Sequence, residues 1–344
     1  MADGLSATLR IGVVGFGYWG PNLCRNLAEV PGVDVAAVAD QHADRRAGAA
    51  RRHPGARLFE EAAELIAEPD LDAVVIATPV GTHCDLGLAA LKAGKDVLVE
   101  KPLAATGAEA ALLVATAERE RRVLMVDHTF VYTGAVRKIA ELLEAGELGE
   151  IRYYDALRIN LGLFQTDVSV VWDLAIHDLS LLQYLLRRRF LTVQATGGSP
   201  LGDGLESVAH LTLNLEGGVQ AHINVSWISP VKLRQTILVG DRKMVVYDDL
   251  EADEKIKVYD RGVVFAAQRQ PPLMPEFRVG YRVGDMYSPR VDRREALWGV
   301  VAHFVDCVRQ RRRPLTGGPE ALELLRVLEA AEWSLRNVGQ RVTL

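Results

Sequence analysis

The hydrophobic positions of the first 128 residues alternate between short continuous apolar runs and segments with helical spacing. A continuous apolar run is typical of a strand buried on both faces, and apolar positions three or four residues apart are typical of a helix. Strands are expected over residues 9–15, 33–39, 73–77, 96–100 and 123–127. Helices are expected over 21–30 and 60–68, and after two pairs with capping-box spacing, Thr82 with Asp85 and Thr106 with Glu109. This alternation predicts βαβ units and a parallel sheet.

The pattern changes after about Gly149. Residues 151–159 mix large apolar and charged positions, as a sheet with one wet face does. Gly217 and Gly218 lie between two strand-like runs and indicate a hairpin. Further strands are expected over 207–215, 219–227, 234–239, 243–247 and 255–259, and helices over 172–186, 295–310 and 319–337, whereas 262–294 shows no assignable period. We therefore predict an α/β protein: a doubly wound parallel sheet in residues 1–128, then an α+β domain with a large, mostly antiparallel open sheet in 129–344.

The segment Gly15-Phe16-Gly17-Tyr18-Trp19-Gly20 fits the pattern G-x-G-x-x-G between a strand and a helix, and Asp40 ends the next strand. This context is the fingerprint of a Rossmann dinucleotide-binding domain, in which the helix start and its free N–H groups hold the pyrophosphate. A carboxylate at Asp40 accepts hydrogen bonds from ribose hydroxyls and repels a 2′-phosphate, so it favours NAD over NADP. Arg45 and Arg46 follow closely and keep a phosphate-bearing cofactor as the alternative.

The composition narrows the class of protein. The chain has 344 residues, of which 49% are hydrophobic and 25% charged, with a formal net charge of −5. Neither nucleic acid nor a membrane is an expected partner at this charge, and no apolar run is long enough to span a bilayer. The three cysteines are far apart and fit no metal or redox motif, which indicates a reduced, cytoplasmic protein.

Two sets of residues carry candidate chemistry. Lys101 follows a buried strand, at the sheet edge where open α/β sheets bind ligands. Asp173 and His177 are four residues apart on an expected helix, so the carboxylate can orient the imidazole and raise its proton affinity. A solvated lysine and an ordinary helix-surface pair remain alternatives for these residues. We expect no metal site, because no third ligand stands at motif spacing.

Together these motifs resemble the Gfo/Idh/MocA oxidoreductases, and the resemblance covers almost the whole chain. Short segments such as Gly17 to Asn22 and His128-Thr129-Phe130 are similar to those of the branch that acts on sugars and nucleotide-linked sugars. The resemblance implies that Lys101 is the catalytic lysine and His177 the acid/base histidine. It implies that Asp173 supports the histidine or touches substrate. It also implies cofactor contacts from a larger set: Gly15, Phe16, Gly17, Tyr18, Trp19, Gly20, Asp40, Thr78, Pro79, His83, Glu100 and Lys101. The family pattern more often has Gly before His128, where this chain has Asp127, so substrate contact and packing are both open for His128.

The expected activity is NAD(H)-dependent hydride transfer to or from a secondary alcohol or ketone of a sugar or nucleotide-linked sugar. The resemblance also implies a homodimer or homotetramer formed through the second-domain sheet. Alternatives are an inositol (cyclitol) dehydrogenase and a catalytically silent dinucleotide-binding sensor. The arginine-rich segment 278–294 is a candidate for contacting a substrate phosphate. Position and residue type suggest further substrate contacts at Tyr132, Arg158, Asn160, Lys232 and Arg234.

Overall fold

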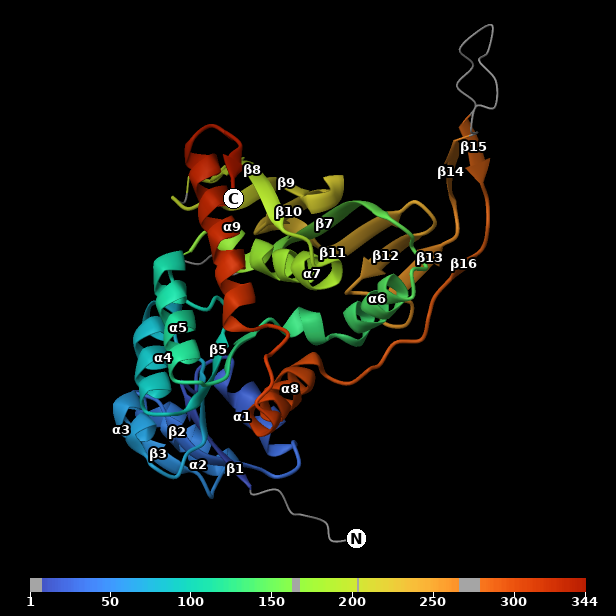
Figure 1. The fold of residues 1–344 in the computed structure, drawn as a ribbon. Coiled ribbons are helices and arrows are strands. Elements are labelled where there is room, and N and C mark those ends of the chain that lie inside the picture. Colours follow the sequence, from blue (N-terminus) through green and yellow to red (C-terminus); the bar gives the residue numbers. More distant parts are fainter. Residues whose placement is uncertain (1–7, 163–167, 203, 266–278) are drawn as a thin grey trace, which may run out of the picture. The chain divides into compact units, whose positions relative to one another are not determined.

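The computed structural model describes residues 8–162, 168–202, 204–265 and 279–344. The chain divides into two compact units (Figure 1). We call Met1–Thr133 with Arg294–Glu329 the Rossmann unit, and Gly134–Arg293 with Ala330–Leu344 the sheet unit.

The Rossmann unit contains a six-stranded sheet in the order β3-β2-β1-β4-β5-β6. All five pairings in it are parallel, as the alternating pattern predicts. Its strands are β1 (Leu9–Val14), β2 (Val33–Ala39), β3 (Arg57–Phe59), β4 (Ala73–Ile76), β5 (Asp96–Glu100) and β6 (Leu124–Asp127). Each of β4, β5 and β6 is buried along its whole length, which explains why these strands read as continuous apolar runs.

The helices of this sheet are α1 (Gly20–Ala28), α2 (Ala43–Arg52), α3 (Ala62–Ala67), α4 (His83–Lys92) and α5 (Gly107–Arg119). The cap predicted at Thr106 is confirmed, because its side chain accepts a hydrogen bond from Glu109 N at 3.2 Å. The helix predicted after Thr82 is confirmed, but the capping bond expected from its side chain is wrong. A 3₁₀ turn, η1 (Val80–Thr82), precedes α4, and the Thr82 hydroxyl donates to the carbonyl of Pro79 instead. The pattern did not predict α2, which buries only Ala49.

Residues 294–329 belong to the Rossmann unit, although the sequence boundary at 128 assigns them to the second domain. They contain α8 (Ala296–Gln310) and the start of α9 (Gly318–Arg336). Glu295 accepts hydrogen bonds from Arg25 on α1, Arg309 donates to the carbonyl of Gly32, and Thr316 donates to the carbonyl of Val126. The C-terminal part of the chain therefore returns to the first sheet. No local sequence pattern predicts this return.

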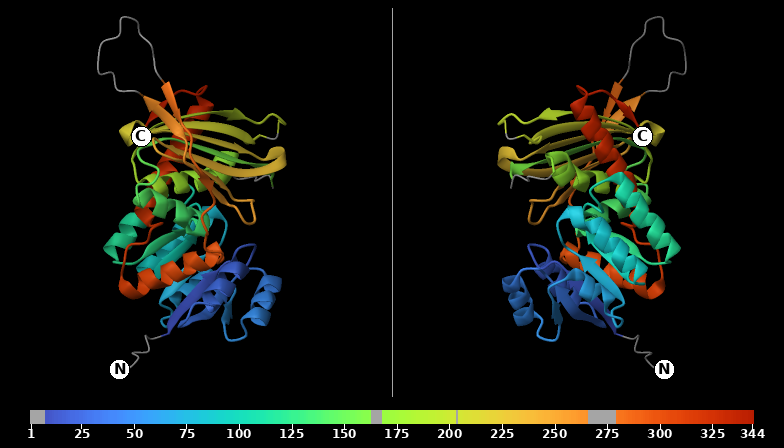
Figure 2. Two further views of the ribbon diagram at one scale, coloured as in Figure 1. Left: turned by 90° about the vertical axis from the view of Figure 1, so that its right-hand side faces the viewer. Right: turned by 90° about the vertical axis from the view of Figure 1, so that its left-hand side faces the viewer.

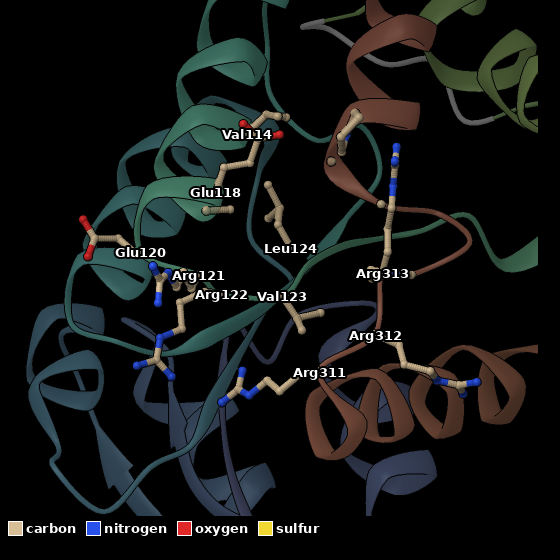
Figure 3. Close-up of a pocket in the computed structure, with 15 residues that line it drawn as sticks. Val114, Glu118, Glu120, Arg121, Arg122, Val123, Leu124, Arg311, Arg312 and Arg313 are labelled. Carbon is tan, nitrogen blue, oxygen red and sulfur yellow. The ribbon is translucent and has the colours of Figure 1, made fainter.

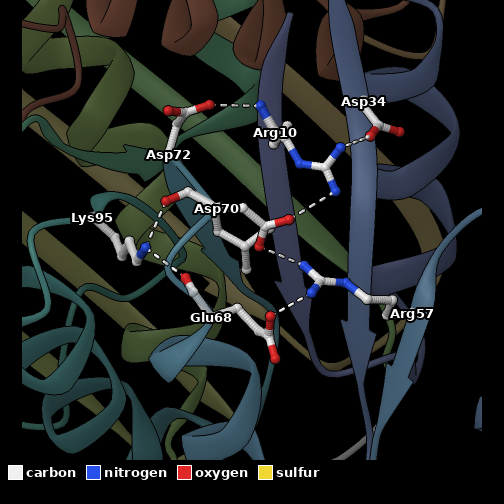
Figure 4. Close-up of polar contacts among 8 residues, drawn as sticks. Arg10, Asp34, Arg57, Glu68, Asp70, Asp72 and Lys95 are labelled. Atoms are coloured by element: carbon white, nitrogen blue, oxygen red, sulfur yellow. Dashed lines mark hydrogen bonds and ion pairs between the residues drawn. The ribbon is translucent and has the colours of Figure 1, made fainter.

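A charged network ties together the strand starts of the Rossmann sheet (Figure 4). Arg10 pairs with Asp34 at 3.2 Å and with Asp70 at 3.1 Å, and Arg57 pairs with Asp70 at 2.7 Å. The buried Lys95 donates to the carbonyls of Glu68 and Leu71. These contacts lie at the edge of the sheet opposite the glycine turn, so they support the strands without occupying the edge that binds ligands.

The sheet unit has a nine-stranded sheet in the order β16-β13-β12-β11-β7-β10-β9-β8-β17. Only β7 and β10 pair in parallel among its described strands, which confirms a mostly antiparallel sheet. Its strands are β7 (Ile151–Leu161), β8 (Phe190–Gly198), β9 (Val208–Leu215), β10 (Gln220–Ser226), β11 (Ile228–Gly240), β12 (Met244–Asp248), β13 (Ile256–Tyr259), β16 (Met286–Tyr287) and β17 (Val342–Thr343).

The hairpin predicted at Gly217-Gly218 is confirmed by the antiparallel pairing of β9 with β10. The sequence pattern did not predict α6 (Gly134–Glu144) and β8. Residues 262–294 contain a two-stranded ribbon of β14 (Gly262–Phe265) and β15 (Val279–Arg282), then β16; residues 266–278 lie outside the described part. The helix predicted over 172–186 is η3 (Val171–Ala175), which is a π-helix, followed by α7 (Ile176–Leu186). Helices α6 and α7 lie on one face of the sheet (Figure 2).

Candidate active site

The glycine turn after β1 has three glycines with separate roles. Gly15 has φ 93°, and a Cβ there would lie 2.5 Å from the carbonyl oxygen of Ala77. A Cβ on Gly20 would lie 2.1 Å from the carbonyl oxygen of Gly15, so the helix start packs directly on the turn. A Cβ on Gly17 would meet only the flexible end of Arg45, at 3.4 Å. The backbone at Gly17 is therefore open to an approaching group, which fits a dinucleotide pyrophosphate at the start of α1. Tyr18 and Trp19 are exposed beside it, at 81% and 40%.

Asp40 is buried at the end of β2, and backbone groups of the turns around it orient its carboxylate. Phe16 N donates to Asp40 Oδ2 at 2.7 Å, and His42 N donates to Asp40 Oδ1 at 2.9 Å. Arg45 lies 3.6 Å from the same Oδ2. A carboxylate has about four lone-pair sites, so ribose hydroxyls can still be accepted alongside these partners. The site thus holds both the carboxylate that suits NAD and an arginine that would suit a phosphate.

His83 connects the two loops that follow β4 and β5. Its Nδ1 lies 2.8 Å from the carbonyl oxygen of Pro102, and its Nε2 lies 2.8 Å from that of Thr78. Burial lowers the pKa of His83, and the two backbone hydrogen bonds oppose that shift. Thr78 Oγ1 and Thr82 Oγ1 are 2.7 Å apart on the same loop. The loop of Thr78 and Pro79 is therefore held against the segment that begins with Lys101.

Four residues at the carboxyl ends of β5 and β6 form what we call the Lys101 cluster: Glu100, Lys101, Asp127 and His128. Lys101 N donates to Glu100 Oε2 at 2.9 Å, and Thr129 Oγ1 donates to Asp127 Oδ1 at 2.6 Å. Burial, and then the positive charge of Lys101, lower the pKa of His128 to about 3. His128 is thus neutral at physiological pH, and the cluster sets one ammonium beside two acids.

In the sheet unit, Asp173 lies within the π-helical turn that immediately precedes His177. Asp173 Oδ2 accepts a hydrogen bond from Trp227 Nε1 at 3.1 Å. The carbonyl of His177 accepts one from Ser180 Oγ at 2.7 Å. π-helical turns are rare in proteins, but those that occur are often at functional sites, because they turn side chains away from the directions of a regular helix. The indole of Trp227 therefore fixes the carboxylate one turn away from the imidazole.

The five suggested substrate contacts have different environments. Arg158 is buried on β7 and binds Asp178 through two hydrogen bonds, of 2.8 Å and 3.0 Å. Arg234 pairs with Arg158 in the strand register, so both lie on the sheet face that carries α7, and Arg234 also approaches Asp249 at 3.4 Å. Asn160 has the same parity on β7 and is half-buried, and Lys232 is exposed on β11.

Tyr132 belongs to the Rossmann unit and is buried beneath α8. Its hydroxyl lies 3.2 Å from Thr316 Oγ1, and its ring packs against His303. In the arginine-rich segment, Arg278 lies outside the described residues, whereas Arg282 pairs with Asp260 and Arg293 with Asp253.

Sequence reasoning missed the contacts that Asp127 and Thr129 make in the Rossmann unit, and those of Asp178 and Trp227 in the sheet unit. A signal for Asp127 exists, since it ends a buried strand as Glu100 does. Asp178 and Trp227 depend on partners from distant elements, and no sequence pattern identifies them.

A cavity of about 760 Å³ lies at the edge of the Rossmann sheet where the strands begin, against the start of β6 (Figure 3). Three of its arginines have carboxylate partners: Arg311 binds Asp96, Arg312 binds Asp306 and Arg313 binds Glu320. Open α/β sheets bind nucleotides at the carboxyl ends of their strands, so this cavity is not the dinucleotide site. The described ranges contain no group of three His, Cys, Asp or Glu side chains arranged for a metal, and no helix long and apolar enough for a membrane span.

Two family models match the chain. One, described as an oxidoreductase family with an NAD-binding Rossmann fold, matches residues 9–128. The other, described as the GFO/IDH/MocA C-terminal domain, matches residues 136–246.

Relatives of this chain are named as dehydrogenases or reductases of sugars, cyclitols and nucleotide sugars. D-apiose dehydrogenase of Paraburkholderia graminis is 26% identical over 96% of this chain and 88% of its own length. Inositol 2-dehydrogenase 2 of Saccharopolyspora erythraea is 33% identical over 63% of this chain and 66% of that protein. The dTDP-3,4-didehydro-2,6-dideoxy-alpha-D-glucose 3-reductase of Saccharopolyspora spinosa is 30% identical over 74% of this chain and 81% of that protein.

Among solved structures, the UDP-N-acetylglucosamine 3-dehydrogenase GnnA from Acidithiobacillus ferrooxidans has a TM-score of 0.81 at 25% identity. It covers 96% of this chain and 98% of its own.

Proposed function

This chain belongs to the GFO/IDH/MocA family of oxidoreductases, and on that basis we propose that it transfers a hydride between NAD(H) and a secondary alcohol or ketone carbon of a sugar or nucleotide-linked sugar. One observation carries the proposal furthest. Lys101 and its acidic neighbours end β5 and β6, at the same sheet edge as the glycine turn that ends β1. A dinucleotide seated on that turn extends along this edge.

The binding roles follow from the open backbone at Gly17 and the buried carboxylate of Asp40. The turn from Gly15 to Gly20 would hold the pyrophosphate, and Asp40 would accept the ribose hydroxyls. The loop of Thr78, Pro79 and His83 would line the nicotinamide, and Glu100 would meet its ribose. When bound, the nicotinamide accepts or supplies the hydride, and the protein supplies orientation and charge.

The catalytic roles follow from charge and proton balance. Oxidation of a secondary alcohol removes a hydride from carbon and a proton from the hydroxyl, so negative charge develops on oxygen. The Lys101 ammonium would stabilise that charge, and the His177 imidazole would accept the proton. Asp173, held by Trp227, would orient His177. In the reducing direction the same pair returns the proton to the oxygen.

A His177→Asn variant tests the acid/base role. We expect turnover to fall by about 10²- to 10⁴-fold, the usual contribution of a positioned acid/base. NADH affinity, measured by fluorescence titration, should stay within about twofold, because Asn keeps a polar side chain of similar size. His210→Asn, an exposed histidine of the same unit, is the matched control. Near-normal turnover in His177→Asn would remove this residue from the mechanism.

The substrate is tested by NAD⁺ reduction against inositols, free hexoses, sugar phosphates and nucleotide sugars. Activity on a nucleotide sugar supports the leading proposal. Activity on free inositol instead supports a cyclitol dehydrogenase, which the 33% identity to inositol 2-dehydrogenase 2 favours as second candidate. Dinucleotide binding without turnover on any compound would indicate a sensor.

Asp40 should determine the cofactor preference. We expect Asp40→Asn to weaken NADH binding by about tenfold, because the charged acceptor for the ribose is lost. NADPH binding should strengthen, because Arg45 is released from its ion pair to meet a 2′-phosphate. Fluorescence titration of both nucleotides measures the preference, with Asp44→Asn on the exposed start of α2 as control. A parallel change for NADH and NADPH would contradict this role.

We also propose that the face of the nine-stranded sheet opposite α6 and α7 joins copies of the chain into a homodimer or homotetramer. Large apolar side chains are exposed on it, including Tyr153, Leu161 and Leu233 at 39%, 68% and 38%. The double change Tyr153→Lys with Leu233→Glu should yield monomers in light scattering coupled to size exclusion. Leu112→Glu, at an exposed position of α5, should not. A monomeric unmodified protein would contradict the proposal.

A further inference from the structure

Glu100 and Asp127 lie opposite each other in the parallel register of β5 and β6. Adjacent strands are about 4.8 Å apart, so the side chains of paired residues stand within reach of each other. Both are buried, at 8% and 1% exposure. The sheet therefore places two carboxyl groups side by side in a setting with little water to separate their charges.

The neighbours of the pair set its electrostatics. Lys101 N donates to Glu100, and the Thr129 hydroxyl donates to Asp127. The Lys101 ammonium is the positive charge against the pair, because His128 is buried and neutral. His83, from α4, is buried too, and burial lowers its pKa; its two ring nitrogens lie 2.8 Å from the carbonyl oxygens of Pro102 and Thr78. One ammonium cannot balance two buried carboxylates, and like charges this close disfavour double ionisation.

The proton affinities of the two acids agree with this geometry. Burial, followed by the charge of Asp127, raises the pKa of Glu100 well above its usual range. Burial raises the pKa of Asp127 to about 6, and hydrogen bonding from Thr129 limits the rise. The two groups interact, so the protons leave the pair in two steps that belong to both acids.

We propose that Glu100 and Asp127 share one proton near neutral pH, and that its release to solvent shifts the protein's preference from NADH toward NAD⁺. This rests on the proposed function, which puts the nicotinamide at this edge of the sheet. The oxidised ring carries a positive charge that the reduced ring lacks, so a second negative charge nearby favours the oxidised form. Asp127 would thus be a positioning residue for charge, acting through Glu100.

The experiment measures the dissociation constants of NADH and NAD⁺ between pH 5.5 and 9, by fluorescence titration and by competition. In the unmodified protein, we expect the ratio of the NADH constant to the NAD⁺ constant to rise on the order of tenfold across this range. In Asp127→Asn the midpoint of the rise should move to lower pH, because Glu100 stays buried but loses the neighbouring charge of Asp127 that helps to raise its pKa. Glu118→Gln, an exposed acid of α5, is the control and should keep the full rise.

Thr129→Val gives a second readout that does not remove a carboxyl group. Loss of the hydroxyl donor disfavours ionised Asp127, so the midpoint of the rise should move to higher pH with the same amplitude. A flat ratio in the unmodified protein would overturn the proposal, as would an unchanged midpoint in Asp127→Asn. Failure of both nucleotides to bind would overturn the proposed function itself, which is a distinct result.

Discussion

Replacing Lys101 with methionine is expected to reduce turnover by about 10³-fold or more while the protein still binds NADH. Methionine keeps an unbranched side chain in place but removes the ammonium. The developing alkoxide then loses its charge partner. Glu100 and Asp127 lose the positive charge that opposes the rise of their pKa values.

Steady-state rates with the substrate found in the compound panel measure the effect, and fluorescence titration reports NADH affinity. Lys92→Met is the matched control, because Lys92 is exposed on the last turn of α4. Lys101→Arg keeps the charge but changes its shape and reach, so we expect only partial recovery. Turnover of Lys101→Met within about tenfold of the unmodified protein would exclude a catalytic role, since that loss lies below the range for removing such a group.

Replacing Asp178 with asparagine is expected to destabilise the sheet unit more than any surface substitution. The Arg158–Asp178 pair is buried, with side-chain exposures of 4% and 2%. Burial opposes the charge of Arg158, and the Asp178 carboxylate overcomes this, so the pKa of Arg158 is raised. Removing one partner leaves a buried charge uncompensated, which costs about 3–5 kcal/mol.

The midpoint of thermal unfolding should therefore fall by about 10 °C. Near-ultraviolet circular dichroism measures this midpoint. Replacing both residues together, Arg158→Met with Asp178→Leu, should recover much of the loss, because no unpaired charge remains. Glu144→Gln, which removes an ion pair with Arg187 at 64% exposure on both sides, should leave the midpoint unchanged within error. An equal loss in the single and double variants would show that the pair acts through shape rather than charge.

Local pattern predicted five of the six strands of the first sheet. Continuous apolar runs predicted β1, β2, β4, β5 and β6. Each of these strands is covered on both faces, so successive residues along it are apolar. Sequence spacing was also sufficient for the glycine turn and Asp40, because strand, turn and helix are consecutive and the geometry is local. By contrast, α2 and β3 are short or largely polar, so they leave little periodicity to detect.

The sequence by itself determined the order of the elements, the dinucleotide turn and the reactive side chains, since each depends on residues close together along the chain. Tertiary structure alone decided three further features. Parallel register pairs Glu100 with Asp127, burial on the α7 face joins Arg158 to Asp178, and the return of residues 294–329 completes the Rossmann unit. These features unite residues between 20 and about 270 positions apart, such as Arg25 and Glu295. The free energy of these contacts depends on the desolvation and charge of the groups that meet in the folded protein. Because the partners are distant in sequence, neighbouring residues in the chain do not predict them.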